Sequence, residues 1–198
     1  PLCVHPSVTE AQLAQGLPTL AYERVKRPLE TEAPVALFGH EFCALIVEVG
    51  SGVSRFQVGD RVAARAKLPC GVCSLCRSER SDRCRDGPVI GFDLPGCFAE
   101  VARLPAIALV KVDDRVSDSE AACLQALSDS VAAVETAGLG MGETVVILGQ
   151  GSMGLECLQI ARISGAGMII TVDVRDESCE MSRRLGADHA LNARAGEI

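Results

Sequence analysis

The sequence predicts a mixed fold, with a mostly β first part and an α/β second part. The first part contains short apolar runs bounded by turn residues, as in "CALIVEVG" and "RFQVGDRVAARA". The second part alternates buried-strand runs with segments whose apolar residues have helical spacing. Strand–helix–strand–helix order is the signature of a parallel sheet with right-handed crossovers. We therefore predict two domains, over residues 1–117 and 118–198.

Turn signals place the elements of the first part. Residues 9–15 are compatible with a helix, and "CALIVEVG" predicts the first clear strand at residues 43–50. Gly52 and the Gly59-Asp60 pair mark turns between strands. Short strands resume in "CFAEVARLPAIALVKV", where a proline interrupts them. These signals predict a small, mostly β domain.

The second part begins with a helix. Apolar residues at helical spacing in "SDSEAACLQALSDSVAAVETAGL" follow a Ser117 or Ser119 cap, with Glu120 in the first turn. Glycines from Gly138 onward end this helix. The strand runs "ETVVILG" and "MIITVDV" each precede a further helix, and "HALNA" begins a third strand.

Composition and charge argue against several classes of protein. No apolar stretch approaches the ~20 residues that cross a bilayer, and no signal-peptide pattern opens the chain, so we expect a cytoplasmic protein with no membrane partner. The net charge is −7 at pH 7 and no basic face stands out, which argues against nucleic-acid binding. Ten cysteines in a reducing compartment are more often metal-binding or catalytic than cross-linked.

Four of these cysteines lie within the loop of residues 69–85: Cys70, Cys73, Cys76 and Cys84. The spacing C-x2-C-x2-C-x7-C lets four thiolates converge at about 2.3 Å on one zinc ion in tetrahedral geometry. Such a site has no open position, so the zinc would be structural. The alternatives are unrelated buried thiols or a disulfide pair. Four arginines either offset the charge of the zinc site or form a solvated face: Arg77, Arg80, Arg83 and Arg85.

A glycine motif predicts a dinucleotide site. The pattern G-x-G-x-x-G in "VVILGQGSMG" follows a strand run and opens a helix, which is the context that gives the motif meaning. Gly149 permits a tight turn, Gly151 lets the backbone approach a pyrophosphate, and Gly154 allows close helix–strand packing. The helix N-terminus offers N–H groups to the phosphates. The predicted cofactor-binding residues of the motif are Gly149, Gly151, Ser152, Met153 and Gly154.

Asp173 ends the second strand run, at the distance where an acidic residue accepts the ribose hydroxyls. A carboxylate at this position would repel a 2′-phosphate, which favours NAD over NADP. Arg175 is close enough to keep NADP as a second alternative. The remaining alternative is a glycine-rich turn in another α/β domain that binds nothing.

His40 and Glu41 stand in "FGHEF", just before the first clear strand. Further segments follow in one order: "VEVGSGVSRFQVGDRV", the four cysteines, "GFDLPGCFAEV", "GQGSMG" and "SRRLGADHALN". From about Phe38 to the C-terminus the chain resembles the zinc-dependent medium-chain alcohol dehydrogenases, closest to the polyol and threonine dehydrogenase-like branch.

The resemblance implies a GroES-like catalytic domain with a structural zinc loop, followed by the N-terminal half of a Rossmann domain, with the active site between them. It implies an alcohol substrate, NAD(P), and a homo-oligomer when full length. By the same resemblance, His40 is a ligand of a second, catalytic zinc and Glu41 is a ligand or near-ligand. A zinc ion with an open position polarises an alcohol oxygen, and the nicotinamide accepts the hydride.

The sequence departs from this family at several positions. Cys3, in "PLCVHPSV", is the only cysteine before His40, but it lacks the family's Cys-Gly-x-Asp context; His5 could serve as ligand or proton relay instead. Gln125 stands where the polyol branch supplies a glutamate, on the same predicted helix as Cys123. Because of these departures, a second function is an alternative: a non-catalytic zinc-stapled nucleotide-binding protein with a degraded catalytic metal site. The four-cysteine loop disfavours a third, a zinc-free quinone reductase relative.

The remaining cysteines are interpreted as small buried hydrophobic residues: Cys43, Cys97, Cys123, Cys157 and Cys179. Cys97 replaces a glycine of the family's "GGFAE" turn. The chain opens with Pro and ends where the first half of a dinucleotide fold finishes, so we expect it to be part of a longer protein.

Overall fold

The computed structural model describes residues 2–4, 10 and 38–196. The chain divides into two compact units, Pro1–Gln125 and Ala126–Ile198. This division falls a few residues after the predicted domain boundary between residues 117 and 118. The predicted helix over residues 9–15 lies outside the described residues except for Glu10, which is helical.

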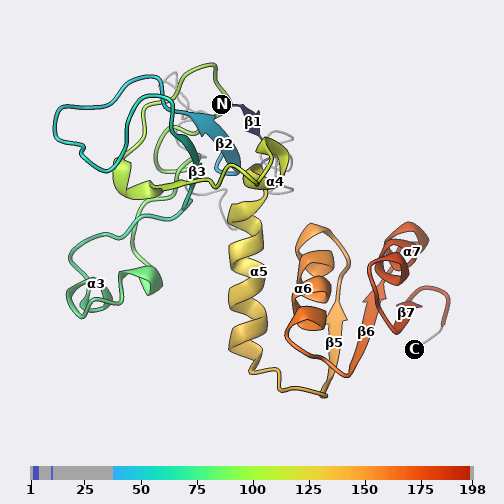
Figure 1. Ribbon diagram of the computed structural model, residues 1–198. Helices are drawn as coiled ribbons and strands as arrows, with labels where there is room; N and C mark the ends of the chain where they lie inside the picture. Colours follow the sequence, from blue (N-terminus) through green and yellow to red (C-terminus); the bar gives the residue numbers. More distant parts are fainter. Residues whose placement is uncertain (1, 5–9, 11–37, 197–198) are drawn as a thin grey trace, which may run out of the picture. The chain divides into compact units, whose positions relative to one another are not determined.

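The first unit is built on a four-stranded antiparallel sheet in the order β1-β2-β3-β4. Its strands are short: β1 (Cys3–Val4), β2 (Phe42–Leu45), β3 (Arg61–Ala64) and β4 (Leu109–Lys111) (Figure 1). Phe42, Val62 and Leu109 from these strands pack with Phe56 and Ile90 in the main hydrophobic core. The mostly β first part is therefore confirmed.

In two segments the structure contains less strand than the sequence predicts. β2 ends at Leu45, although the predicted strand continued to residue 50. Beyond it, only Ile46 still bonds across the hairpin, donating to the Asp60 carbonyl and accepting from the Gly59 amide. Residues 97–104 are all described and none of them lies in a strand. The amides of Cys97 and Phe98 donate to the carbonyls of residues 39 and 38 instead, so this segment covers the chain just before β2.

The predicted long helix after Ser117 is two helices, α4 (Asp118–Ala122) and α5 (Leu124–Ala137). Ser117 and Glu120 form a capping box at the start of α4, as the sequence predicts. Cys123 ends α4, and its amide donates to the Glu120 carbonyl in the tighter geometry of a 3₁₀ turn. Cys123 and Gln125 therefore do not share one helix.

The loop of residues 69–85 contains only two short elements, α3 (Ser74–Arg77) and η1 (Ser81–Arg83), and neither has a buried residue. It leaves the sheet as a separate lobe (Figure 1). A 3₁₀ turn, η2 (Ala106–Ala108), leads into β4. The lobe has no hydrophobic core of its own, so other interactions must hold it together.

The second unit contains a parallel sheet in the order β5-β6-β7, as the strand–helix pattern predicts. Its elements alternate along the chain: β5 (Thr144–Leu148), α6 (Ser152–Ile163), β6 (Met168–Asp173), α7 (Asp176–Arg184) and β7 (His189–Asn192). Leu158, Ala161 and Ile169 form its core. Because the strands are parallel, the glycine loop after β5 and Asp173 at the end of β6 lie at the same edge of the sheet. Within the described residues, no helix is long and apolar enough to cross a membrane.

Candidate functional site

The four cysteines of the lobe converge. Their sulfur atoms all lie within 4.8 Å of one another, and two Sγ–Sγ distances, Cys70–Cys76 and Cys73–Cys84, are 3.9 Å. Ligands at about 2.3 Å in a tetrahedron are separated by about 3.8 Å, so the sulfur atoms are spaced for one zinc ion. All ten cysteines are free thiols, which contradicts the disulfide alternative.

Backbone amides point at the sulfur atoms of the lobe. The Cys70 amide donates to Cys84 Sγ (3.3 Å), the Cys73 amide to Cys70 Sγ (3.3 Å), and the Cys76 amide to Cys73 Sγ (3.5 Å). These bonds favour the thiolate form, and the Cys70 amide is the main reason that the pKa of Cys84 falls to about 6. The amides of residues 72 and 73 likewise lower the pKa of Cys70. Burial has the opposite effect on Cys76 and raises its pKa to about 12. A cation among the sulfur atoms would overcome that last penalty.

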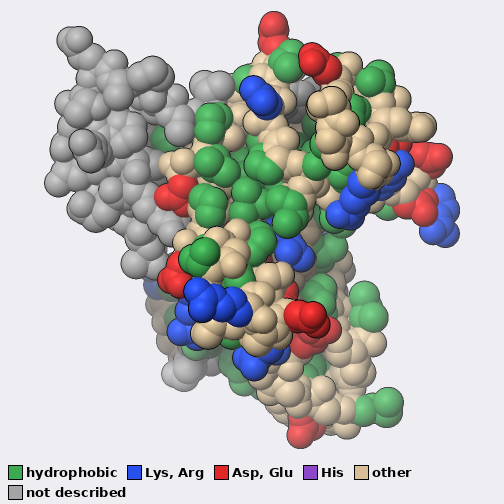
Figure 2. Space-filling view, turned by 90° about the vertical axis from the view of Figure 1, so that its left-hand side faces the viewer, with side chains coloured by type: hydrophobic (Ala, Val, Ile, Leu, Met, Phe, Trp, Pro, Cys, Tyr) green, Lys and Arg blue, Asp and Glu red, His purple; other side chains and the backbone are tan. Residues whose placement is uncertain are grey.

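The arginines of the lobe face solvent. All four side chains are exposed, and Lys and Arg side chains are visible on the face that carries the lobe (Figure 2). Arg83 approaches Asp82, with 3.9 Å between Nε and Oδ2. This placement favours the solvated-face alternative.

His40 and Glu41 lie side by side and are both largely buried. His40 Nε2 is 3.6 Å from Glu41 Oε1, and the His40 ring packs near Phe92 with 5.2 Å between ring centroids. On its other side, His40 Nδ1 is 3.0 Å from Oε1 of Glu10, which also accepts a hydrogen bond from the Gly39 amide (2.8 Å). A carboxylate beside Nδ1 holds the orientation of the ring, and Nε2 lies on the side of Glu41, where the two side chains could share a metal ion.

The structure does not bring Cys3 to this pair. Cys3 lies opposite Cys43 in the β1–β2 ladder and packs against a small apolar cluster that includes Cys43 and Ala121. Among the described residues, the lobe cysteines are the only group of three or more His, Cys, Asp or Glu residues spaced to share a metal ion. Gln125 is half-buried in the first turn of α5. His5 lies outside the described residues.

The other cysteines follow the prediction only in part. Cys43, Cys97 and Cys179 are buried, and burial raises the pKa of Cys97 to about 11. Cys123 and Cys157 are only half-buried, contrary to the prediction. Both lie at helix surfaces, Cys123 at the break between α4 and α5 and Cys157 within α6.

The glycine motif has the geometry that a dinucleotide loop requires. Gly149 has a φ of 86°, which disfavours other residues. A Cβ atom on Gly154 would lie 1.9 Å from the Gly149 carbonyl oxygen, so α6 can approach the loop only because this position is glycine. Gly151 is exposed at the N-cap of α6, and no atom lies within 4 Å of the place that a Cβ atom would take. Ser152 and Met153 form the exposed first turn of the helix.

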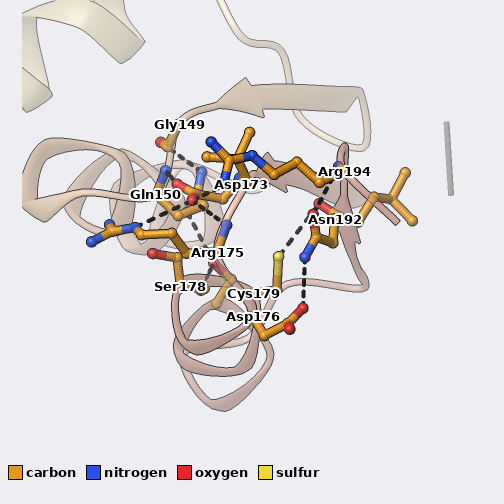
Figure 3. Close-up of polar contacts among 12 residues, drawn as sticks. Gly149, Gln150, Asp173, Arg175, Asp176, Ser178, Cys179, Asn192 and Arg194 are labelled. Carbon is orange, nitrogen blue, oxygen red and sulfur yellow. Dashed lines mark hydrogen bonds and ion pairs between the residues drawn. The ribbon is translucent and has the colours of Figure 1, made fainter. Parts of the chain in front are cut away.

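Asp173 accepts three hydrogen bonds from the backbone. Its Oδ2 accepts from the Gln150 amide (2.6 Å), and its Oδ1 accepts from the amides of Val174 (2.8 Å) and Arg175 (2.9 Å) (Figure 3). Burial raises the pKa of this carboxyl group, but the amides and the Arg175 charge outweigh burial and lower it overall. Asp173 is therefore ionised at neutral pH and partly used to hold the loop.

Sequence reasoning missed two residues of these sites. Glu10 contacts His40 from 30 positions earlier in the chain, and no spacing signal marks it. Gln150 occupies a variable position of the glycine motif, yet its side chain is only 2% exposed. Its buried contacts depend on α7, which the motif does not include.

Comparisons with known proteins agree with the fold. Residues 10–114 match the family model of the alcohol dehydrogenase GroES-like domain. The L-threonine 3-dehydrogenase of Rhizobium johnstonii is 35% identical over 155 residues, covering 78% of this chain and 45% of that protein. The L-threonine 3-dehydrogenase of Francisella tularensis subsp. novicida is 36% identical over 154 residues, covering 78% and 44%. The chain thus spans about half the length of these curated relatives.

Solved structures show the same likeness. Alcohol dehydrogenase TADH from Thermus sp. ATN1 superposes with a TM-score of 0.81 at 28% identity, covering 97% of this chain and 54% of that one. Galactitol-1-phosphate dehydrogenase from Escherichia coli gives a TM-score of 0.76 at 26% identity, covering 87% and 51%. With the GroES-like match extending over more than half of its 198 residues, the chain belongs to the zinc-dependent medium-chain alcohol dehydrogenase family.

Proposed function

We propose that the protein is a zinc-dependent oxidoreductase that transfers a hydride between an alcohol and NAD(P). The observation that carries this proposal is the glycine loop, in which Gly149, Gly151 and Gly154 adopt the required geometry at the N-terminus of α6, beside an ionised Asp173. The N–H groups of the first turn of α6 would bind the cofactor diphosphate. Family membership supplies the expectation of alcohol oxidation.

NAD is the favoured cofactor. The low pKa of Asp173 keeps a negative charge where a 2′-phosphate would lie. Arg175 lies with its Nε 3.5 Å from Asp173 Oδ1 and is largely exposed, so it supports NADP as the weaker alternative.

Two zinc sites are part of the proposal. The lobe cysteines Cys70, Cys73, Cys76 and Cys84 fit a structural ion by donor type and spacing. His40 and Glu41 offer an imidazole nitrogen and a carboxylate oxygen for a catalytic ion, with Cys3 and Gln125 as further proposed ligands. A catalytic zinc, when bound, supplies Lewis-acid polarisation of the alcohol oxygen. Glu10 would orient His40, and the buried position of His40 and Glu41 would limit access of water.

The substrate class is a secondary alcohol or polyol. Two relatives are named L-threonine 3-dehydrogenase and galactitol-1-phosphate dehydrogenase, and both named compounds are polar molecules that carry a secondary hydroxyl group. We also propose a cytoplasmic protein, with a homo-oligomer as the full-length form and neither nucleic acid nor membrane as partner.

One observation supports the second function, a non-catalytic nucleotide-binding protein with a degraded catalytic metal site. Among the described residues, no three His, Cys, Asp or Glu side chains at His40 are spaced to share one metal ion, whereas a catalytic zinc site has three protein ligands. A non-catalytic, zinc-stapled nucleotide-binding protein would also have the lobe and the glycine loop.

Zinc content per folded chain separates these two functions. Elemental analysis after dialysis against a weak chelator should give two zinc ions, and His40→Ala should reduce the count to one. A count of one that Cys70→Ser and Cys84→Ser abolish, with His40→Ala without effect, would favour the binding protein. Reduction of NAD by the full-length protein with a panel of secondary alcohols and polyols then tests the activity directly.

A further inference from the structure

A buried amide side chain lies beneath the glycine loop. Gln150 Nε2 donates to the carbonyl oxygens of Ile147 (3.2 Å) and Gly149 (3.0 Å), and its Oε1 accepts from Ser182 Oγ (3.1 Å). The opposite amide orientation would place the side-chain oxygen against two carbonyls, so the hydrogen-bond partners fix the assignment. Ser182 lies on α7 and is fully buried, and its one hydroxyl hydrogen is shared between Gln150 Oε1 and the Ser178 carbonyl, which lies 2.8 Å from Oγ.

Both polar groups of the Gly149–Gln150 peptide unit are hydrogen-bonded, one by the Gln150 side chain and the other by Asp173. The Gly149 carbonyl accepts from the Gln150 side chain, while the amide of that same peptide bond donates to Asp173 (Figure 3). Since a peptide bond is planar, fixing its carbonyl and its N–H fixes the orientation of the plane. Gly149 has a positive φ and would otherwise leave this peptide free to rotate.

The loop is also confined on the side of α6. Gly154 allows the helix to approach the Gly149 carbonyl, and a Cβ atom there would lie 3.3 Å from Gln150 Nε2. Among the described residues, no buried side-chain nitrogen or oxygen atom lacks a hydrogen-bond partner. The loop is therefore ordered by contacts with β6, α6 and α7 within the chain itself.

We propose that Gln150, together with Ser182, is a positioning residue for the dinucleotide. The pair orients the Gly149–Gln150 peptide, so that the following N–H groups already face the diphosphate before the cofactor arrives. A loop ordered in advance loses less conformational entropy on binding, which strengthens affinity without any contact to the ligand. This inference rests on the proposed dinucleotide site and adds the residues that set its affinity.

Matched variants test the proposal. Gln150→Met keeps the volume and removes every side-chain hydrogen bond, while Gln159→Met makes the same change at an exposed amide on α6 that bonds only the Leu155 carbonyl among the described contacts (3.1 Å). Ser182→Ala is paired with Ser130→Ala, a fully buried serine that donates to Glu156 (2.7 Å) and not to the loop. If Gln150→Met does not fold, the comparison of Ser182→Ala with Ser130→Ala still tests the positioning role.

Affinity for NADH, measured by fluorescence titration of the full-length protein and its variants, is the first readout. We expect Gln150→Met to raise the Kd about tenfold and Ser182→Ala about threefold, with Gln159→Met and Ser130→Ala close to wild type. Equal Kd values for Ser182→Ala and Ser130→Ala would overturn the proposal, because general destabilisation would then explain both.

Amide hydrogen exchange of residues 149–154, without cofactor, is the second readout. Exchange should quicken about tenfold in Gln150→Met and remain unchanged in Ser130→Ala. If the full-length wild-type protein binds no NADH, the proposed function fails, and the exchange rates alone decide whether Gln150 orders the loop. Unchanged exchange in Gln150→Met would reject the positioning role whatever the cofactor result.

Discussion

The cysteine lobe and the glycine loop are ordered by opposite means. The lobe has two short helical elements without a buried residue, and its four sulfur atoms converge on one point. The glycine loop lies between β6, α6 and α7, and its peptide groups are hydrogen-bonded within the chain. A site of the first kind depends on its ligand for order, whereas a site of the second kind exists before its ligand binds.

The largest effect should follow from removing sulfur ligands. We expect the double variant Cys70→Ser, Cys84→Ser to lose one zinc ion per chain, because two of four ligands cannot hold the ion against a chelator. Trypsin cleavage at the exposed arginines of residues 77–85 should then quicken at least about tenfold, since neither helical element of the lobe has a buried residue to hold it without the ion. Elemental analysis and timed proteolysis measure the two effects.

Cys157→Ser is the matched control, because this half-buried thiol lies on α6 and near the Ser130 carbonyl (3.8 Å). It should keep the zinc count of the wild type. NADH affinity should be unchanged in the lobe variant, and a parallel loss of zinc and NADH binding would contradict the separation of the two regions.

The second effect concerns close packing at the loop. Gly154→Ala would put a Cβ atom 1.9 Å from the Gly149 carbonyl oxygen, a backbone atom that cannot turn away. We expect a loss of about 3 kcal/mol in the free energy of unfolding, against a helix-propensity gain of at most about 1 kcal/mol. Urea denaturation followed by circular dichroism measures the difference.

Gly151→Ala sharpens this test within the same motif. No atom lies within 4 Å of the place that its Cβ would take, and its φ of −77° suits any residue. This variant should fold with nearly wild-type stability but bind NADH more weakly, because the added methyl group keeps the diphosphate away from the backbone. Equal destabilisation by both variants would show that the loop is not packed as described.

The regions also differ in how far the sequence predicts them. Cys70, Cys73, Cys76 and Cys84 could be assigned as one site because their spacing within a single loop reflects ligand geometry. The parallel sheet could be predicted because "ETVVILG" and "MIITVDV" are continuous apolar runs, which are typical of parallel strands, although Val146 and Leu148 of β5 are exposed in the structure. In both cases the signal is local.

Non-local contacts account for what the sequence did not predict. Glu10 reaches His40 across 30 positions, and Gln150 reaches Ser182 across 32. The break at Cys123 follows from a tightened last turn of α4, which the apolar spacing of the region does not mark. Cys3 is proposed as a metal ligand from its place before His40, and the pairing of β1 with β2 places it opposite Cys43, a neighbour that its sequence context does not mark. Local patterns thus give elements and compact motifs, and tertiary packing decides which side chains meet.

The smallest effect should be the pH dependence of the glycine loop. The pKa of Asp173 is lowered from 3.8 in the folded chain, so its carboxylate stabilises the fold at pH values above the unfolded pKa. That contribution is lost as the pH falls below about 4 and through the lower, folded pKa. Asp173→Asn should therefore be less stable than wild type at pH 6, and the difference should shrink toward pH 3.

Glu180→Gln is the control for this comparison, because Glu180 is an exposed carboxylate on α7 whose Oε2 lies 3.6 Å from Arg183 Nη1. Exposed ion pairs contribute at most about 1 kcal/mol, so this variant should differ little from wild type at either pH. Urea titrations at the two pH values measure the differences. Asp173 bonds three backbone amides within one tight turn, and protonation therefore loosens the loop itself. An Asp173→Asn difference that stays constant from pH 6 to pH 3 would mean that the charge of this carboxylate does not hold the loop, and that the glycine loop relies on Gln150 and packing alone.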